Sequence, residues 1–104
     1  MLEERDLRDA VVVRLAGEVD LSSVGEISAP LFAVLARTDG GVVRVDCSEV
    51  AFIESQGLAM MVQAQRFADE HGTSLVWMNP PKRMLEVIHL VGMSDVLTIS
   101  ITSP

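Results

Sequence analysis

Residues 42–58, VVRVDCSEVAFIESQGL, take the chain from a buried strand toward a helix, and the rest of the fold is worked out from them. The first part, Val42–Asp46, is rich in β-branched residues and follows the breaker pair Gly40-Gly41, a pattern typical of a central strand. Helical spacing of apolar residues begins at about Gly57. A central strand that leads into a helix predicts a strand-helix unit of a parallel sheet.

Three other segments have the composition of strands. They are Val11–Leu15, Ser74–Met78 and Val96–Ile99. The first of them is a β-branched run that Gly17 stops. Residues 2–8 are a candidate edge strand that would form a hairpin with residues 11–16, although Leu2 and Leu7 do not alternate cleanly. We therefore expect a sheet of four to five strands.

The first predicted helix has one apolar face. That face comprises Val24, Ile27, Leu31, Val34 and Leu35. Ser23-x-x-Glu26 in front of it is a capping-box pattern. Pro30 interrupts the helical pattern because proline removes a backbone hydrogen bond, so the helix is expected either to kink there or to begin later with Ser28 as its cap.

Two further helices are indicated by their end signals. One is expected over residues 57–71 and ends at Gly72, which suits a left-handed terminus. The other follows Asn79-Pro80, a cap and a first-turn proline, and ends at Gly92. Strands that alternate with helices need crossover connections. We expect an α/β fold with a mostly parallel sheet packed by about three helices.

Composition fits one domain over residues 1–104, because this is an ordinary domain length and hydrophobic residues make up 49% of it. The formal net charge of −7 repels phosphate backbones and anionic lipid, so neither direct nucleic-acid binding nor membrane insertion is expected. The start of the chain is acidic, unlike a secretory signal, and no apolar run approaches the roughly 18 to 20 residues of a membrane span. We expect a cytoplasmic protein.

Few residues support enzyme chemistry. Ser55 lacks the first glycine of a Gly-x-Ser-x-Gly elbow and has no histidine near it in sequence, while His71 and His89 fit structural positions on helices. Lys82 is the only lysine and follows no glycine-rich phosphate loop. Cys47 is the only cysteine, which excludes an intrachain disulfide and favours a small apolar core residue. We expect no catalytic activity, no metal and no cofactor.

One segment, Phe52–Leu58, is left unexplained by packing, and it places the Ser55 hydroxyl at the start of a helix. The simplest interpretation of Ser55 is a helix N-cap. The same geometry allows a regulatory role, because free amides and the helix dipole favour negative charge by typically about 0.3 to 1 kcal/mol at an exposed site. A phosphate on Ser55 would then be tolerated without unfolding.

The motifs, in their order and spacing, resemble the STAS domain family and, within it, the stand-alone anti-sigma factor antagonists. Leu15–Asp20 is similar to the family's strand ending in Gly-Glu-aliphatic-Asp, and Val45–Ile53 is similar to the strand and turn before its phosphorylation site. Lys82–Leu85, Gly92-Met93 and Val96–Ile99 are similar to its third helix and last strand. The resemblance covers about residues 11–99.

The family's switch pattern is Asp-Ser-(small)-Gly-Leu, and this chain departs from it at Glu54 and Gln56. The resemblance implies that Ser55 is phosphorylated and that Gly57 allows close approach at the helix start. It also implies that the partner-binding face comprises residues 54–57 and Asp20. For Asp20, a turn carboxylate that binds nearby amides is an equal alternative.

The resemblance also implies partner switching. The unphosphorylated antagonist binds an anti-sigma factor, which is itself a serine kinase with its own ATP, and frees the sigma factor. Phosphorylation at Ser55 blocks binding, and a phosphatase resets the serine. Two alternatives stay open: a STAS subunit of a stressosome-type or lipid-transport complex, and a small serine-dependent enzyme in which Asp20 or a histidine assists Ser55.

Overall fold

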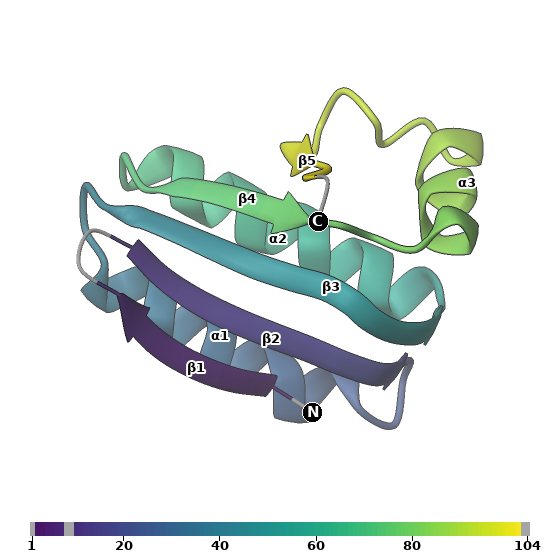
Figure 1. Ribbon diagram of the computed structural model, residues 1–104, viewed down its shortest axis with the longest axis horizontal. Coiled ribbons are helices and arrows are strands. Elements are labelled where there is room, and N and C mark those ends of the chain that lie inside the picture. The colour runs from purple at the N-terminus through teal and green to yellow at the C-terminus, as the bar shows by residue number, and fades with distance from the viewer. Residues whose placement is uncertain (1, 8–9, 103–104) are drawn as a thin grey trace.

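The computed structural model describes residues 2–7 and 10–102 (Figure 1). Its elements are β1 (Leu2–Leu7), β2 (Ala10–Val19), α1 (Val24–Arg37), β3 (Val42–Ile53), α2 (Ser55–Glu70), β4 (Ser74–Met78), α3 (Lys82–Leu90) and β5 (Ile99–Ser100). The alternation of strands and helices confirms the predicted α/β class. None of the helices in the described ranges is long and apolar enough to cross a bilayer.

The described strands form one sheet in the order β1-β2-β3-β4-β5. β2 to β5 run parallel, and β1 runs antiparallel to β2 with Leu2 opposite Leu15 and Leu7 opposite Ala10. The candidate edge strand is thus confirmed, apart from residue 8, which lies outside the described residues. Each helix between parallel strands returns the chain to the neighbouring position in the sheet, which is the crossover connection that was expected.

Most of the core lies between the sheet and two helices, and Met84 and Ile88 of α3 extend it. Figure 1 shows α1 and α2 side by side on one face of the sheet, while α3 lies near the carboxyl ends of the strands. Alternate residues of the strands point toward these helices and are fully or almost fully buried, among them Val13, Leu15, Val43, Val45, Cys47, Leu75 and Trp77. The prediction that Cys47 is an apolar core residue is confirmed, and burial raises the pKa of its thiol to about 12.

Pro30 does not break α1, which begins at Val24 and continues to Arg37 as one helix. The alternative start at Ser28 is therefore wrong. The helix start predicted by the capping box is confirmed, since Ser23 is the N-cap residue, but the predicted hydrogen bond is wrong. Ser23 makes no side-chain cap hydrogen bond, and its hydroxyl donates to the carbonyl of Glu18 at 2.7 Å, which holds the preceding turn closed.

α2 begins at Ser55, two residues before the predicted start, and ends at Glu70. Gly72 follows with φ of 67°, the left-handed conformation expected there. α3 begins at Lys82, later than predicted. Asn79 does not cap it because the Asn79 side chain is engaged with Thr102, accepting from its amide at 2.8 Å and donating to its hydroxyl at 3.1 Å.

The last strand is shorter than predicted. Val96 and Leu97 lie in a turn in which both amides donate to the carbonyl of Met93 at 3.1 Å, and β5 is limited to Ile99–Ser100. A turn of this kind uses the amides that a longer strand would offer to β4. The sequence alone did not indicate this, because a short apolar run fits both structures.

Gln65 is a polar residue in the core, only 3% exposed, that links α2 to the edge of the sheet. Its Oε1 accepts hydrogen bonds from the indole nitrogen of Trp77 at 3.0 Å and from the amide of Thr98 at 3.1 Å. Its Nε2 lies 3.4 Å from the carbonyl oxygen of Leu75, to which it donates. Because all its polar atoms are used, Gln65 can be buried without the cost of an unpaired amide.

Candidate functional site

The carboxyl ends of β2 and β3 and the start of α2 meet at one end of the sheet (Figure 1). Val19 pairs with Ile53, and the amide of the next residue, Glu54, donates to the carbonyl of Val19 at 3.0 Å. Asp20 follows Val19 directly. The structure therefore brings all of the predicted site residues to the same end: Asp20, Glu54, Ser55, Gln56 and Gly57.

Ser55 is exposed and is the first residue of α2. The N-cap position belongs to Glu54, whose backbone is extended and whose side chain makes no cap hydrogen bond. The interpretation of Ser55 as the N-cap is wrong, although its placement at a helix start is confirmed. The Ser55 hydroxyl has only a long contact, 3.4 Å, with Oε1 of Gln56 among the described residues. It is therefore accessible to another protein.

The first turn of α2 offers free backbone amides. Its first hydrogen bond joins the amide of Leu58 to the carbonyl of Glu54 at 3.0 Å. The amides of residues 55–57 have no acceptor within the described part of the chain. Such amides, together with the helix dipole, favour an anion. A phosphate on Ser55 would meet a compatible backbone.

Gly57 is buried where α2 approaches the strands. A Cβ at this position would lie 2.7 Å from Cγ1 of Val19, 2.8 Å from Cγ1 of Ile53 and 2.9 Å from the carbonyl oxygen of Val19. Contacts this short are not tolerated, so any side chain would push α2 away from the sheet. Gly57 thereby fixes the position of Ser55 relative to Asp20.

Asp20 lies in the turn between β2 and α1, and its Oδ1 organises that turn. The hydroxyl of Ser22 donates to it at 2.6 Å, the amide of Ser22 at 3.0 Å and the amide of Ser23 at 3.2 Å. These bonds, led by that of the Ser22 hydroxyl, lower the pKa of the Asp20 carboxyl. This is the turn-carboxylate arrangement. Oδ2 of Asp20 accepts no hydrogen bond from a described residue, so it is available to a partner.

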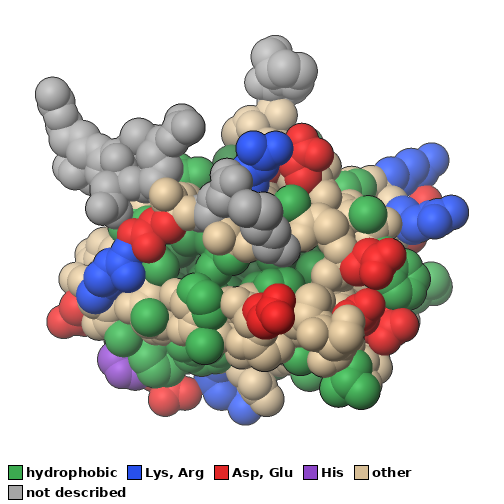
Figure 2. All heavy atoms as spheres, turned by 90° about the horizontal axis from the view of Figure 1, so that it is seen from below, with side chains coloured by type: hydrophobic (Ala, Val, Ile, Leu, Met, Phe, Trp, Pro, Cys, Tyr) green, Lys and Arg blue, Asp and Glu red, His purple; other side chains and the backbone are tan. Residues whose placement is uncertain are grey.

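Two large apolar side chains are exposed around this site, which the sequence analysis did not find. Leu21 is 71% exposed beside Asp20, and Phe52 is 45% exposed at the end of β3, where it pairs with the exposed Glu18. Figure 2, which keeps the horizontal axis of Figure 1, shows acidic, basic and hydrophobic side chains mixed at this end of the molecule. Exposed apolar groups rimmed by charges are typical of a protein-docking surface. A sequence signal existed, since both residues lie in the connection between a predicted strand and the next predicted helix.

The structure gives Ser55 no catalytic base on its own helix. His71 lies sixteen positions further along, about 24 Å at the helical rise, and is held against Phe67 by a 2.8 Å contact between its Nδ1 and the backbone oxygen. No group of three or more His, Cys, Asp or Glu side chains in the described residues is placed to hold a metal ion. The exposed Ser55 hydroxyl and the exposed side chains of Leu21 and Phe52 fit recognition by another protein.

The sequence profile described as "Mlab, STAS domain" matches residues 2–99. The chain belongs to the STAS domain family. This STAS domain is 29% identical over 98 residues to the anti-sigma-B factor antagonist of Listeria monocytogenes, covering 94% of the chain and 84% of that protein. It is 26% identical over 93 residues to the anti-sigma-B factor antagonist of Bacillus subtilis, covering 89% and 84%.

Solved structures of the anti-sigma factor antagonist SpoIIAA share the fold. The unphosphorylated form matches with a TM-score of 0.78 and 18% identity over 99% of this STAS domain and 89% of that chain. The phosphorylated form, from Bacillus, matches with a TM-score of 0.73 and 20% identity over 99% and 92%. At these identities the match shows the fold, and it confirms the STAS architecture expected from the motifs.

Proposed function

We propose that this STAS domain is a cytoplasmic anti-sigma factor antagonist. It works by partner switching, which is controlled by phosphorylation of Ser55. The observation that carries the proposal is the exposed Ser55 hydroxyl at the first turn of α2, at the same end of the sheet as Asp20 and Glu54. The curated relatives named as antagonists support it, and so does the existence of SpoIIAA in two phosphorylation states.

In the proposed cycle, the unphosphorylated chain binds an anti-sigma factor that is a serine kinase and thereby frees the sigma factor. The kinase supplies the bound ATP and transfers a phosphate to Ser55. A phosphatase removes it again. Glu54 and Gln56 are exposed on either side of the hydroxyl, so they would contact the kinase and help to select it.

The charge balance explains how one phosphate would end binding. It adds about −1.5 to −2 charges at pH 7 beside Glu54, on a chain of net charge −7. The helix amides and dipole stabilise the phosphate by only about 0.3 to 1 kcal/mol. An unfavourable charge buried in an interface costs several kcal/mol, which lowers the affinity a hundredfold or more. The phosphorylated protein therefore stays folded but loses its partner.

The test incubates the purified protein with ATP and, in turn, each anti-sigma factor kinase encoded in its genome. We expect the intact mass to rise by one phosphate, with fragmentation placing it on Ser55. Ser55→Ala should bind the kinase but stay unmodified, and Ser94→Ala, at another exposed serine, should react like the wild type. A phosphate on a different residue, or none with any candidate, contradicts the proposal.

A pull-down from the native cell separates this function from its alternatives. Recovery of a serine kinase supports the antagonist, whereas recovery of a transporter ATPase or of stressosome-type proteins favours a STAS subunit of those assemblies. A serine-dependent enzyme is tested with a fluorophosphonate probe on the purified chain. Labelling of Ser55 without any partner would favour the enzyme.

A further inference from the structure

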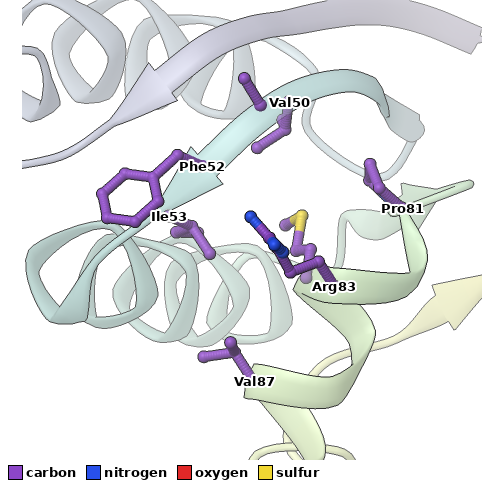
Figure 3. Close-up of a pocket in the computed structure, with 8 residues that line it drawn as sticks. Val50, Phe52, Ile53, Pro81, Arg83 and Val87 are labelled. Atoms are coloured by element: carbon purple, nitrogen blue, oxygen red, sulfur yellow. The ribbon is translucent and has the colours of Figure 1, made fainter.

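A small apolar groove lies between the end of β3 and the start of α3 (Figure 3). Residues 50–53 of β3 form one wall, and Pro81, Met84 and Val87 form the other. The open space is about 110 Å³. Because Ile53 belongs to the groove and stands two residues before Ser55, the groove adjoins the proposed switch.

Arg83 is the charged residue of this groove. Figure 3 shows its side chain pointing from α3 toward β3 across the opening. It is exposed and has no hydrogen bond or ion pair with a described residue, whereas Arg14 pairs with Glu49 and Arg37 with Glu4. Its guanidinium is therefore free to pair with an external acid.

The position of Arg83 is also unfavourable for α3 itself. Lys82 and Arg83 occupy the first turn, which has no acidic residue, and the positive end of the helix dipole lies there. Cations at this place do not stabilise the helix. An incoming carboxylate, by contrast, would meet two cations and the helix dipole together.

The size of the groove limits what can fill it. Its 110 Å³ is less than the roughly 150 Å³ of a cavity known to hold benzene and well below the roughly 300 to 1,000 Å³ of ordinary small-molecule pockets. One apolar side chain fits, but a lipid chain or a cofactor does not. Insertion of a single apolar side chain into a pocket is how many interfaces gain their central contact.

We propose that this groove receives an apolar side chain of the anti-sigma factor and that Arg83 pairs with a carboxylate beside that side chain. The inference rests on the proposed function.

The occupant follows from distance and charge. The two residue steps from Ile53 to Ser55 span at most about 7 Å, and a standard interface of about 800 Å² per partner reaches some 16 Å from its centre. The groove is therefore within reach of a protein docked on Ser55. A second copy of this chain is disfavoured, since both copies carry −7.

Binding of variants to the purified anti-sigma factor tests the inference. Arg83→Glu replaces attraction with repulsion, and Ala51→Phe puts an aromatic ring at the groove wall. Each should weaken binding about tenfold or more. Arg66→Glu, at an exposed position of α2, makes the same charge change elsewhere and should alter affinity less than about threefold. Unfolding temperatures show whether each variant is folded.

A parallel measurement of Ser55→Asp separates the two ideas. If Ser55→Asp binds weakly while Arg83→Glu and Ala51→Phe bind like Arg66→Glu, the groove inference is overturned and the proposed function stands. If no anti-sigma factor of the cell binds the wild type, both are overturned. If the groove variants abolish a dimer in sedimentation without affecting the anti-sigma factor, the occupant is a second copy and the inference is overturned. Recovery of Arg83→Glu binding by an acid-to-arginine change in the partner supports the carboxylate pairing.

Discussion

β2 and β3 are ten and twelve residues long and pair in parallel from Ala10 with Val42 to Val19 with Ile53, whereas β4 and β5 pair only through Trp77 with Ile99 and Met78 with Ser100. The first pair carries the proposed switch at its carboxyl end. The second pair is held in addition by side-chain hydrogen bonds, chiefly those that Gln65 accepts from Trp77 and Thr98. The site is thus built on the part of the sheet with the most backbone pairing, while the C-terminal edge depends on a few polar contacts.

The largest expected difference between these regions is in thiol reactivity. Cys47 lies in β3, fully buried, with a thiol pKa of about 12 instead of 9.0. At pH 8 its thiolate is rarer by on the order of a thousandfold than in the unfolded chain, so alkylation should be slower by at least that factor. The raised pKa also means that stability falls as pH rises above 9.0, because the unfolded thiol then loses its proton.

A cysteine at the C-terminal edge provides the matched comparison. In a Cys47→Ala background, Thr98→Cys places a thiol at an exposed position before β5. We expect iodoacetamide to modify it within about tenfold of the rate for an unfolded peptide. Rapid modification of Cys47 by iodoacetamide in the folded protein would contradict the burial of this part of β3.

Loss of Gln65 should have the next largest effect. Gln65→Leu removes the acceptor for the buried indole of Trp77, and an unsatisfied buried donor costs about 1 to 3 kcal/mol. It also removes the acceptor for the amide of Thr98, where the loss is smaller because this bond is only partly buried. We expect the free energy of unfolding to fall by about 2 to 3 kcal/mol in urea titrations. Gln63→Leu, exposed on the same helix, should change it by less than about 0.5 kcal/mol. Equal stability of the two variants would show that the hydrogen bonds of Gln65 do not stabilise the fold.

Gly57→Ala tests the switch end, where we expect a smaller loss of stability but a change in function. The added methyl meets Val19 and Ile53 at under 3 Å and should cost about 1 to 3 kcal/mol while shifting the start of α2. Phosphorylation of Ser55 should slow even where the variant is fully folded. Gly25→Ala in α1, whose Cβ would have nothing within 4 Å, is the control and should keep both stability and phosphorylation.

Local patterns were sufficient to predict the strands with long β-branched runs, the two helices packed on the sheet and the position of Ser55 at a helix start. These features depend on residues adjacent in sequence or on one helix face. The motif order also gave the family. Helix boundaries were less predictable: α2 begins at Ser55 where the Glu54 amide binds the carbonyl of Val19, a contact across 35 positions of the chain.

The remaining errors have the same physical origin. Asn79 was expected to cap α3, but its side chain is taken by Thr102, and Val96–Leu97 turns back on Met93 instead of extending β5. Both outcomes depend on tertiary partners that a local pattern does not contain. The groove at Arg83 could not be predicted from local patterns either, because its walls come from two elements, β3 and α3, that are separate in the sequence.

The smallest expected effect concerns Asp20. Hydrogen bonds in its turn lower the pKa of the carboxyl, so their contribution to stability is present above the ordinary value of 3.8 and is lost as pH falls below it. Asp20→Asn should remove this pH dependence, and because the carboxyl is at the surface the change in unfolding temperature between pH 7 and pH 3 should be slight. The measurement compares that change in wild type and variant, with Asp39→Asn, at another exposed acid, as control. If Asp20→Asn keeps the wild-type dependence, the hydrogen bonds from Ser22 to the Asp20 carboxylate do not organise the turn in solution.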